Sequence, residues 1–153
     1  MIETVKASDL AFLSAPLLAG LGLPALLTPR KYVQCGGRSA LQPPGWVFGV
    51  AWTTLYALYG VAMALAWRRA GRRWTQGLTV AAITLALLVA WSLVFFNLCA
   101  PAAAFAAILG LLGLSAGTTA AFAHDGATTS AWLTAPLTAW LSFASYLAFC
   151  TMQ

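Results

Sequence analysis

Charged residues are scarce in this chain of 153 residues. Lys, Arg, Asp and Glu together make up 7% of the sequence, whereas 61% of the residues are hydrophobic. A soluble domain carries roughly 25% charged residues, so this chain has too few to cover a surface that faces water. The sequence therefore predicts an integral membrane protein and excludes an ordinary soluble domain.

The longest stretch without charge runs from Arg73 to Asp125, with no Asp, Glu, Lys or Arg between them. A helix needs about 20 apolar residues to cross the hydrocarbon core, so this stretch has room for two spans, divided at Pro101. A transporter coupled to protons or ions usually carries an ionisable group inside the membrane, and none of the predicted spans contains Asp, Glu, Lys or Arg. This absence argues against a coupled pump but leaves a passive carrier open.

Residues that commonly perform catalysis or bind metals are also few. The chain has one histidine, His124, and three cysteines that form no CxxC motif. Asp125 follows His124 in a short turn, and we interpret the two as a solvated loop pair rather than a catalytic dyad. Catalysis by acid–base or nucleophilic routes needs a nucleophile beside a base, paired carboxylates or metal ligands, and no such set is present. We therefore expect neither an enzyme nor a metal centre.

The net charge of +5 does not by itself indicate nucleic-acid binding. Half of the eight basic residues are Arg68, Arg69, Arg72 and Arg73, which stand between two apolar segments. Such a cluster is typical of a short loop at the level of the lipid headgroups. With five spans, Lys6 and these arginines share one side of the membrane, and the three basic residues of the first loop lie on the other. The positive-inside rule then favours a cytoplasmic N-terminus.

The apolar segments predict an all-α bundle of five transmembrane helices that forms one domain over residues 1–153. The predicted spans are residues 10–28, 46–67, 76–98, 102–123 and 131–151. The N-terminus lacks the basic start of a signal peptide, so we expect the first span to be retained. Pro16 predicts a kink and Pro24 a frayed end in this span. Residues 29–45 exceed the about 2–8 residues that usually connect bundle helices, and we expect them to form an ordered lid.

Aromatic residues are concentrated between Leu41 and Trp67. Trp52, Tyr56, Tyr59 and Met63 recur at helical spacing and share one face of the second span. The small residues of this span form a second face suited to close helix contact. These small residues are Gly49, Thr53 and Gly60.

Further aromatic side chains lie inside two other spans. Trp91 and Phe95 stand four residues apart in the third span, and Trp140 and Phe143 three apart in the fifth. Together with the aromatic face of the second span they can face one interior. They either pack the bundle or line a pocket for a flat, apolar ligand, and a pocket lined by aromatics with few polar groups suits such a ligand.

The fourth span carries a pattern of small residues. Gly113 and Gly117 form a GxxxG motif, and Ala106 and Gly110 repeat its spacing. Small residues at this spacing let helix backbones approach closely. The pattern is equally consistent with packing inside the bundle and with a homodimer.

The second span and the residues before it resemble the TspO family of tryptophan-rich sensory proteins and mitochondrial translocator proteins. The family pattern is roughly W-x-P-P-x-W-V-x-x-P-x-W-x-x-L-Y-x-x-M-G, and the chain reads PPGWVFGVAWTTLYALYG. The matching positions are Pro43, Pro44, Trp46, Val47, Trp52, Leu55, Tyr56 and Gly60. The segments AWSLVFF and APLTAWLSFASYLAF are similar to the third and fifth helices of the family, and the resemblance covers residues 10–151 in order.

The resemblance implies a five-helix, usually dimeric protein that binds porphyrins, sterols or synthetic aromatic ligands in a cavity under the first loop. The candidate ligand-binding residues are Leu41, Pro43, Pro44, Trp46, Trp52, Tyr56, Trp91, Phe95, Trp140 and Phe143. Polar cavity groups of the family are replaced here by Leu88, Leu137 and Ala148. No Lys or Arg follows Tyr146, so the sterol-associated motif of the family is absent.

We therefore expect a membrane protein that binds a flat hydrophobic ligand, a porphyrin or other tetrapyrrole more readily than a sterol, for sensing or transport. The alternatives are a passive carrier and a regulatory or assembly protein whose aromatic residues only pack. Light-dependent porphyrin breakdown is the enzymatic exception that the resemblance suggests, and Leu41, in place of the loop aromatic, counts against it. We expect no obligatory cofactor, and the expected partners are the lipid bilayer, the ligand and a possible second copy of the chain.

Overall fold

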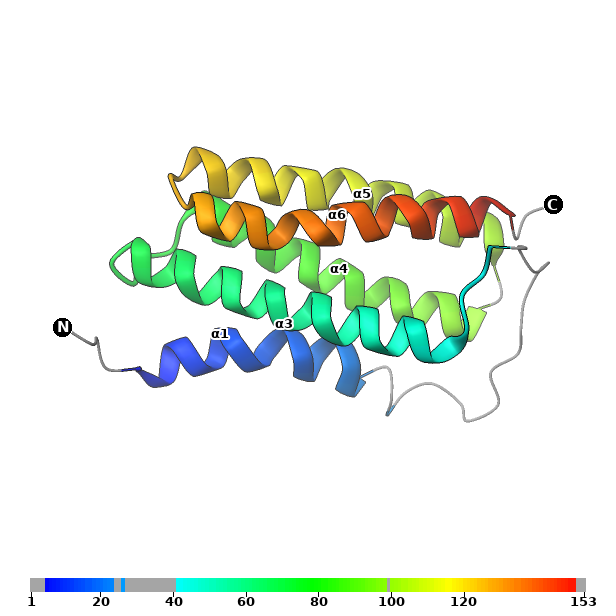
Figure 1. Ribbon diagram of the computed structural model, residues 1–153, viewed down its shortest axis with the longest axis horizontal. Helices are drawn as coiled ribbons and strands as arrows, with labels where there is room; N and C mark the ends of the chain where they lie inside the picture. Colours follow the sequence, from blue (N-terminus) through cyan, green and yellow to red (C-terminus); the bar gives the residue numbers. More distant parts are fainter. Residues whose placement is uncertain (1–4, 24–25, 27–40, 99, 151–153) are drawn as a thin grey trace.

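The computed structural model describes residues 5–23, 26, 41–98 and 100–150, and all regular secondary structure in this part of the chain is helical (Figure 1). The elements are α1 (Ala7–Leu17), the π-helical η1 (Leu18–Gly22), α3 (Gly45–Arg69), α4 (Gln76–Leu98), α5 (Pro101–His124) and α6 (Thr128–Cys150). The predicted all-α membrane bundle is confirmed, and α3 to α6 begin and end close to the predicted boundaries. Residues 29–40 of the predicted lid, which runs to residue 45, and the predicted fraying at Pro24 lie outside the described residues.

Three helices are long and apolar enough to cross a membrane, namely α3, α5 and α6. The segments Ala7–Gly22 and Gln76–Ser92 are shorter apolar helices. The first of these changes to π-helical geometry two residues after Pro16. A π-helical turn holds one more residue per hydrogen-bonded ring than an α-helical turn, so it changes the direction of the side chains that follow.

The contacts join α3 to both α1 and α6, and α5 to both α4 and α6. In Figure 1, α1 lies along the lower edge of the bundle and α5 along the upper edge. Contacts between α3 and α4 are fewer. The start of α1, the α3–α4 turn and the α5–α6 turn lie at one end of the bundle, on the left of Figure 1. We call this the turn end.

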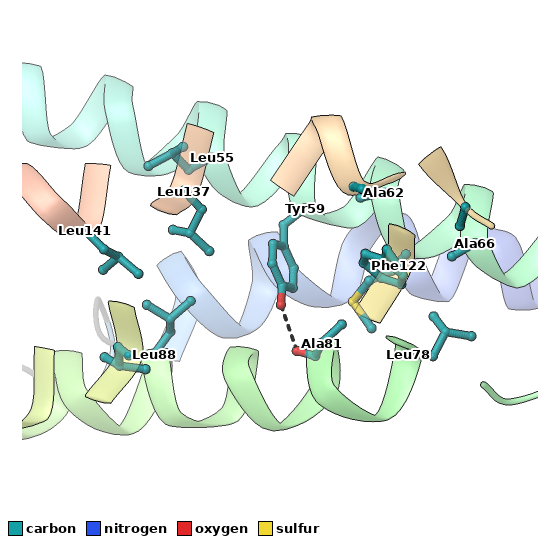
Figure 2. Close-up of a cluster of buried hydrophobic side chains, with 14 of the residues drawn as sticks. Leu55, Tyr59, Ala62, Ala66, Leu78, Ala81, Leu88, Phe122, Leu137 and Leu141 are labelled. Carbon is teal, nitrogen blue, oxygen red and sulfur yellow. Dashed lines mark hydrogen bonds between the residues drawn. The ribbon is translucent and has the colours of Figure 1, made fainter. Parts of the chain in front are cut away.

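Tyr59 lies at the centre of the core. Its side chain is 1% exposed, and its hydroxyl donates a hydrogen bond of 3.0 Å to the carbonyl of Ala81 on α4 (Figure 2). Hydrocarbon offers no water to pair a hydroxyl, so this bond removes the cost of burying one. The surrounding apolar side chains include Leu55, Leu78, Leu88, Phe122, Leu137 and Leu141.

Hydroxyl pairs connect α4, α5 and α6. The pairs are Thr84 with Thr118 at 2.9 Å, Ser115 with Thr138 at 2.8 Å, and Thr119 with Thr134 at 3.0 Å. Hydrogen bonds between membrane helices contribute about 0.6 kcal/mol each on average, so the three act together rather than singly. These hydrogen bonds join the three helices into one unit inside an otherwise apolar protein.

A glycine contact joins α3 to α1. A Cβ built on Gly60 would lie 2.7 Å from the carbonyl oxygen of Leu13, so only glycine lets the two backbones approach this closely. Gly49 and Thr53 are exposed, and a Cβ on Gly49 would meet no atom of the described residues within 4 Å. Of the predicted small-residue face, the contact with α1 therefore uses Gly60, and a helix contact through Gly49 and Thr53 stays a prediction.

An ion-pair cluster joins α1 to the α3–α4 turn. The Asp9 carboxylate is 2% exposed, and its Oδ2 lies 3.5 Å from Arg68 Nε and 3.4 Å from Arg72 Nη2. The backbone N–H of Lys6 also donates a hydrogen bond of 3.0 Å to Asp9 Oδ2. Arg72 has a positive φ of 61°, which is uncommon for a residue with a side chain, and its guanidinium reaches Asp9 from this backbone conformation.

Two further features organise the turn end. Phe12 lies 5.2 Å from Trp67 and 6.0 Å from Trp74 between ring centroids, so three aromatic rings meet beside the ion pairs. Asp125 Oδ2 accepts a hydrogen bond of 2.8 Å from the backbone N–H of Gly77. A carboxylate at the N-terminus of a helix satisfies a free N–H and complements the helix dipole, so Asp125 caps α4.

Candidate ligand site

Trp52 on α3 is the central member of an aromatic cluster that three helices build. Its ring stacks on Tyr56 with centroids 5.6 Å apart. It also lies 6.5 Å from Trp91 on α4 and meets Trp140 on α6 edge to face at 6.3 Å. Four predicted site residues, distant in sequence, are thus brought into direct ring contact.

The cluster extends from Trp91 and Trp140 to three phenylalanines. Trp91 stacks on Phe95 at 5.0 Å, and Trp140 contacts both Phe48 and Phe143 at 5.7 Å. Ring pairs at these separations each contribute about 0.5–1.5 kcal/mol beyond the area that they bury. The name aromatic cluster is used below for Phe48, Trp52, Tyr56, Trp91, Phe95, Trp140 and Phe143.

The aromatic cluster contains few polar atoms, and only some of them have a hydrogen-bond partner among the described residues. Trp91 Nε1 donates to the carbonyl of Ala104 at 3.1 Å. The buried Tyr56 hydroxyl and Trp140 Nε1 have no hydrogen-bond partner among the described residues. A buried donor without a partner costs about 1–3 kcal/mol, so both atoms would gain from an acceptor on a bound molecule.

Gly20 in η1 makes room for Tyr56. A Cβ built on Gly20 would overlap Cζ of Tyr56, so the phenol ring rests directly on the glycine backbone. Pro16, one turn earlier, is buried as well. The π-helical segment therefore supports the side of the aromatic cluster that faces α1.

An open, apolar groove of about 520 Å³ lies between α3 and α6. Its lining residues are Ala51, Thr54, Leu55, Leu58, Pro136, Ala139, Trp140 and Phe143. Ligand sites for small molecules commonly measure about 300–1,000 Å³. Because Trp140 and Phe143 belong both to the groove and to the aromatic cluster, the groove connects the outside of the α3–α6 pair with the cluster.

The remaining predicted site residues lie apart from the aromatic cluster. Leu41 and Trp46 are 63% and 72% exposed, and within the described residues Trp46 has no ring contact. Pro44 is the N-cap residue of α3, and Pro43 before it is half-buried. The two prolines start the helix, and a role for these four residues in ligand binding stays a prediction.

Two residues of the site were missed by the sequence reasoning. Phe48 precedes Trp52 by four residues, so extending the aromatic periodicity by one turn would have found it. Gly20 gave no such signal, because its role depends on a π-helical turn and on a ring from another helix.

The glycines of α5 lie on its outer side. Gly110, Gly113 and Gly117 are exposed, and a Cβ on any of them would meet no atom within 4 Å. They therefore do not serve helix contacts within the described part of this chain. Of the two uses that the sequence left open, contact with a second copy stays a prediction.

Comparison with known proteins gives a consistent result. The family model described as "TspO/MBR family" matches residues 12–153. Tryptophan-rich protein TspO of Chlorobaculum tepidum is 35% identical over 116 residues, which cover 72% of this chain and 71% of that protein. The Translocator protein of Homo sapiens is 34% identical over 72% of this chain and 67% of its own length. The Translocator protein homolog of Schizosaccharomyces pombe is 32% identical over 86% and 82%, respectively.

Proposed function

This chain belongs to the TspO/MBR family, and from that premise we propose that it binds a flat hydrophobic ligand, such as a porphyrin or other tetrapyrrole, at the aromatic cluster. It is an integral membrane protein of the TspO type. The observation that carries the proposal is the set of ring contacts around Trp52, which gathers side chains from α3, α4 and α6 at one place. Flat aromatic molecules stack on such rings.

The balance of polar and apolar groups favours a tetrapyrrole over a sterol. A porphyrin offers a flat ring system for stacking and carboxylates that can accept hydrogen bonds. Tyr56 and Trp140 offer two buried donors without partners among the described residues. A sterol has an aliphatic ring system, so it would not use the stacking surface. Its single hydroxyl would not use both donors.

A binding role, without an obligatory cofactor, is favoured over an enzymatic one. Tyr56 and the tryptophan Nε1 groups are the polar side chains of the aromatic cluster, and none of them stands beside a general base. Sensing and transport both follow from binding. The groove between α3 and α6 favours a passive carrier, because it gives an apolar route to Trp140.

The proposal includes the organisation of the whole chain in the membrane. We infer one domain that crosses the bilayer five times, with Ala7–Gly22 and α4 as crossing segments beside α3, α5 and α6. Tilting and snorkelling of flanking residues let a short apolar helix serve as a span. The partners are lipid, the hydrophobic ligand and a second copy of the chain, with no role for nucleic acid.

Titration with protoporphyrin IX tests the proposed function. In detergent or nanodiscs the protein is expected to shift the Soret absorbance of the porphyrin in a saturable manner, because the aromatic cluster offers a finite site. The control is the same detergent or nanodisc without protein, into which porphyrin partitions without saturation. A linear response that equals this control would contradict the proposal.

The outer face of α5 predicts a dimer contact that a single side chain can block. Gly113→Leu is expected to raise the dissociation constant of a homodimer at least about tenfold, since leucine prevents the close backbone approach that GxxxG permits. Gly49→Leu on α3 is the matched control, because Gly49 is also exposed with no atom within 4 Å of its Cβ position. Light scattering coupled to size exclusion measures the mass, and an intact dimer in Gly113→Leu would place the contact elsewhere.

A further inference from the structure

The four arginines at the turn end fall into two pairs with different surroundings. Arg68 and Arg69 are the last two residues of α3, and Arg72 and Arg73 follow in the turn before α4, so the pairs are distinguished by their contacts rather than by helical spacing. We call Arg68 and Arg72 the inner pair, because both contact Asp9. Arg69 and Arg73 form the outer pair, and both are exposed.

The acidic residues that the structure describes, Asp9 and Asp125, are both engaged elsewhere. Asp9 holds the inner pair and the N–H of Lys6, and Asp125 accepts the N–H of Gly77. Arg69 lies over the α5–α6 turn, where a Cβ built on Gly126 would be 3.4 Å from its Nη2. The outer pair has no ion pair within residues 5–23, 41–98 and 100–150. Two arginines are thus presented without an anionic partner from the described chain.

Aromatic residues near the outer pair indicate its depth in the membrane. Trp74 follows Arg73 directly, is 55% exposed and lies 6.3 Å from Trp67 between ring centroids. Tryptophans at the ends of apolar helices are enriched at the level of the lipid headgroups. By this rule Arg69 and Arg73, which flank the same turn as Trp74, are expected at the level of the lipid phosphates.

We propose that the outer pair, Arg69 and Arg73, binds the phosphate of an anionic phospholipid headgroup at the turn end. Guanidinium groups donate parallel hydrogen bonds to phosphate oxygens, which gives the pair a chemical preference for this group. The occupant is a lipid rather than a soluble phosphate, because its acyl chains can lie along the apolar helices beside Trp74. An anionic lipid is favoured over a zwitterionic one, because a choline group would add positive charge next to two arginines.

Native mass spectrometry of the protein with equimolar phosphatidylglycerol and phosphatidylcholine tests this proposal. The wild-type protein is expected to retain phosphatidylglycerol about fivefold or more over phosphatidylcholine, as two basic groups at a surface favour anionic lipid. Arg69→Gln with Arg73→Gln should reduce this preference to near unity. Arg69→Lys with Arg73→Lys should keep most of it, which separates loss of charge from loss of structure.

The matched control is Arg30→Gln with Lys31→Gln, which removes the same charge from the connection before α3. This variant is expected to keep the wild-type preference. Equal retention of both lipids by the wild-type protein would overturn the proposal, and so would an equal loss of preference in the control. Inorganic phosphate at millimolar concentration forms a third arm, and complete displacement of phosphatidylglycerol by it would assign the site to a soluble anion instead.

Discussion

Trp52→Leu is expected to weaken protoporphyrin binding about tenfold or more, since it removes the central ring of the aromatic cluster. Trp52 contacts Tyr56, Trp91 and Trp140, so its loss separates the side chains from α3, α4 and α6 that the ligand would bridge. Leucine keeps the position apolar and helical, so the fold should persist. The Soret shift of the porphyrin measures affinity without depending on the number of tryptophans in the protein.

Trp132→Leu is the matched control for this prediction. Trp132 belongs to α6, as Trp140 does, but it is 74% exposed. Its replacement should leave porphyrin affinity unchanged. If both variants bind as the wild-type protein does, the ligand does not use the aromatic cluster, and if both lose affinity equally, the effect reflects general loss of tryptophan rather than this site.

Gly60→Ala is expected to lower the free energy of unfolding by about 1–3 kcal/mol, in the range for overpacked cores. The added Cβ would lie 2.7 Å from the Leu13 carbonyl oxygen and 3.1 Å from that of Phe12. Backbone atoms cannot move aside as a flexible side chain can, so α1 must separate from α3. Unfolding in mixed micelles with increasing denaturing detergent measures the loss.

Gly49→Ala provides the comparison on the same helix. A Cβ at Gly49 meets nothing within 4 Å, so this change should leave stability unchanged or slightly raised. Equal stability of the two variants would show that α1 and α3 are not held at Gly60. Gly60→Ala should also weaken porphyrin binding. Displacing α1 moves Gly20 in η1, which supports Tyr56 in the aromatic cluster.

The helices α3 to α6 were predictable because each contains a long apolar stretch without Asp, Glu, Lys or Arg, and α4 matches the prediction at both ends. The aromatic face of α3 was predictable from helical spacing. Which of its residues join the aromatic cluster and which join the core was not. Tyr56 joins the cluster, whereas Tyr59, less than one turn further on, is buried in the core and bonds to Ala81. Periodicity gives the direction of a side chain and says nothing about which helix it meets at a given depth.

Contacts that depend on a second element could not be predicted. The arginine cluster reads as four equivalent charges, and only the position of Asp9 divides it into pairs. Gly60 and Gly49 look alike in the sequence, yet within the described residues Gly60 faces a backbone and Gly49 does not. The π-helical segment Leu18–Gly22 was not predicted either, because its residues are as apolar as those of the adjoining α-helix and show no distinct pattern.

The position of Asp125 has a consequence for biosynthesis. Its carboxylate caps α4 through Gly77, which precedes it by 48 residues in the chain. While the protein is being made, α4 leaves the ribosome without this cap and gains it only after α5 has been inserted and the chain has turned back. The contact of α1 with α3 at Gly60 needs no later residue. The helices α1 and α3 can therefore pair early, while the α4–α5–α6 unit is completed only once α6 has been made.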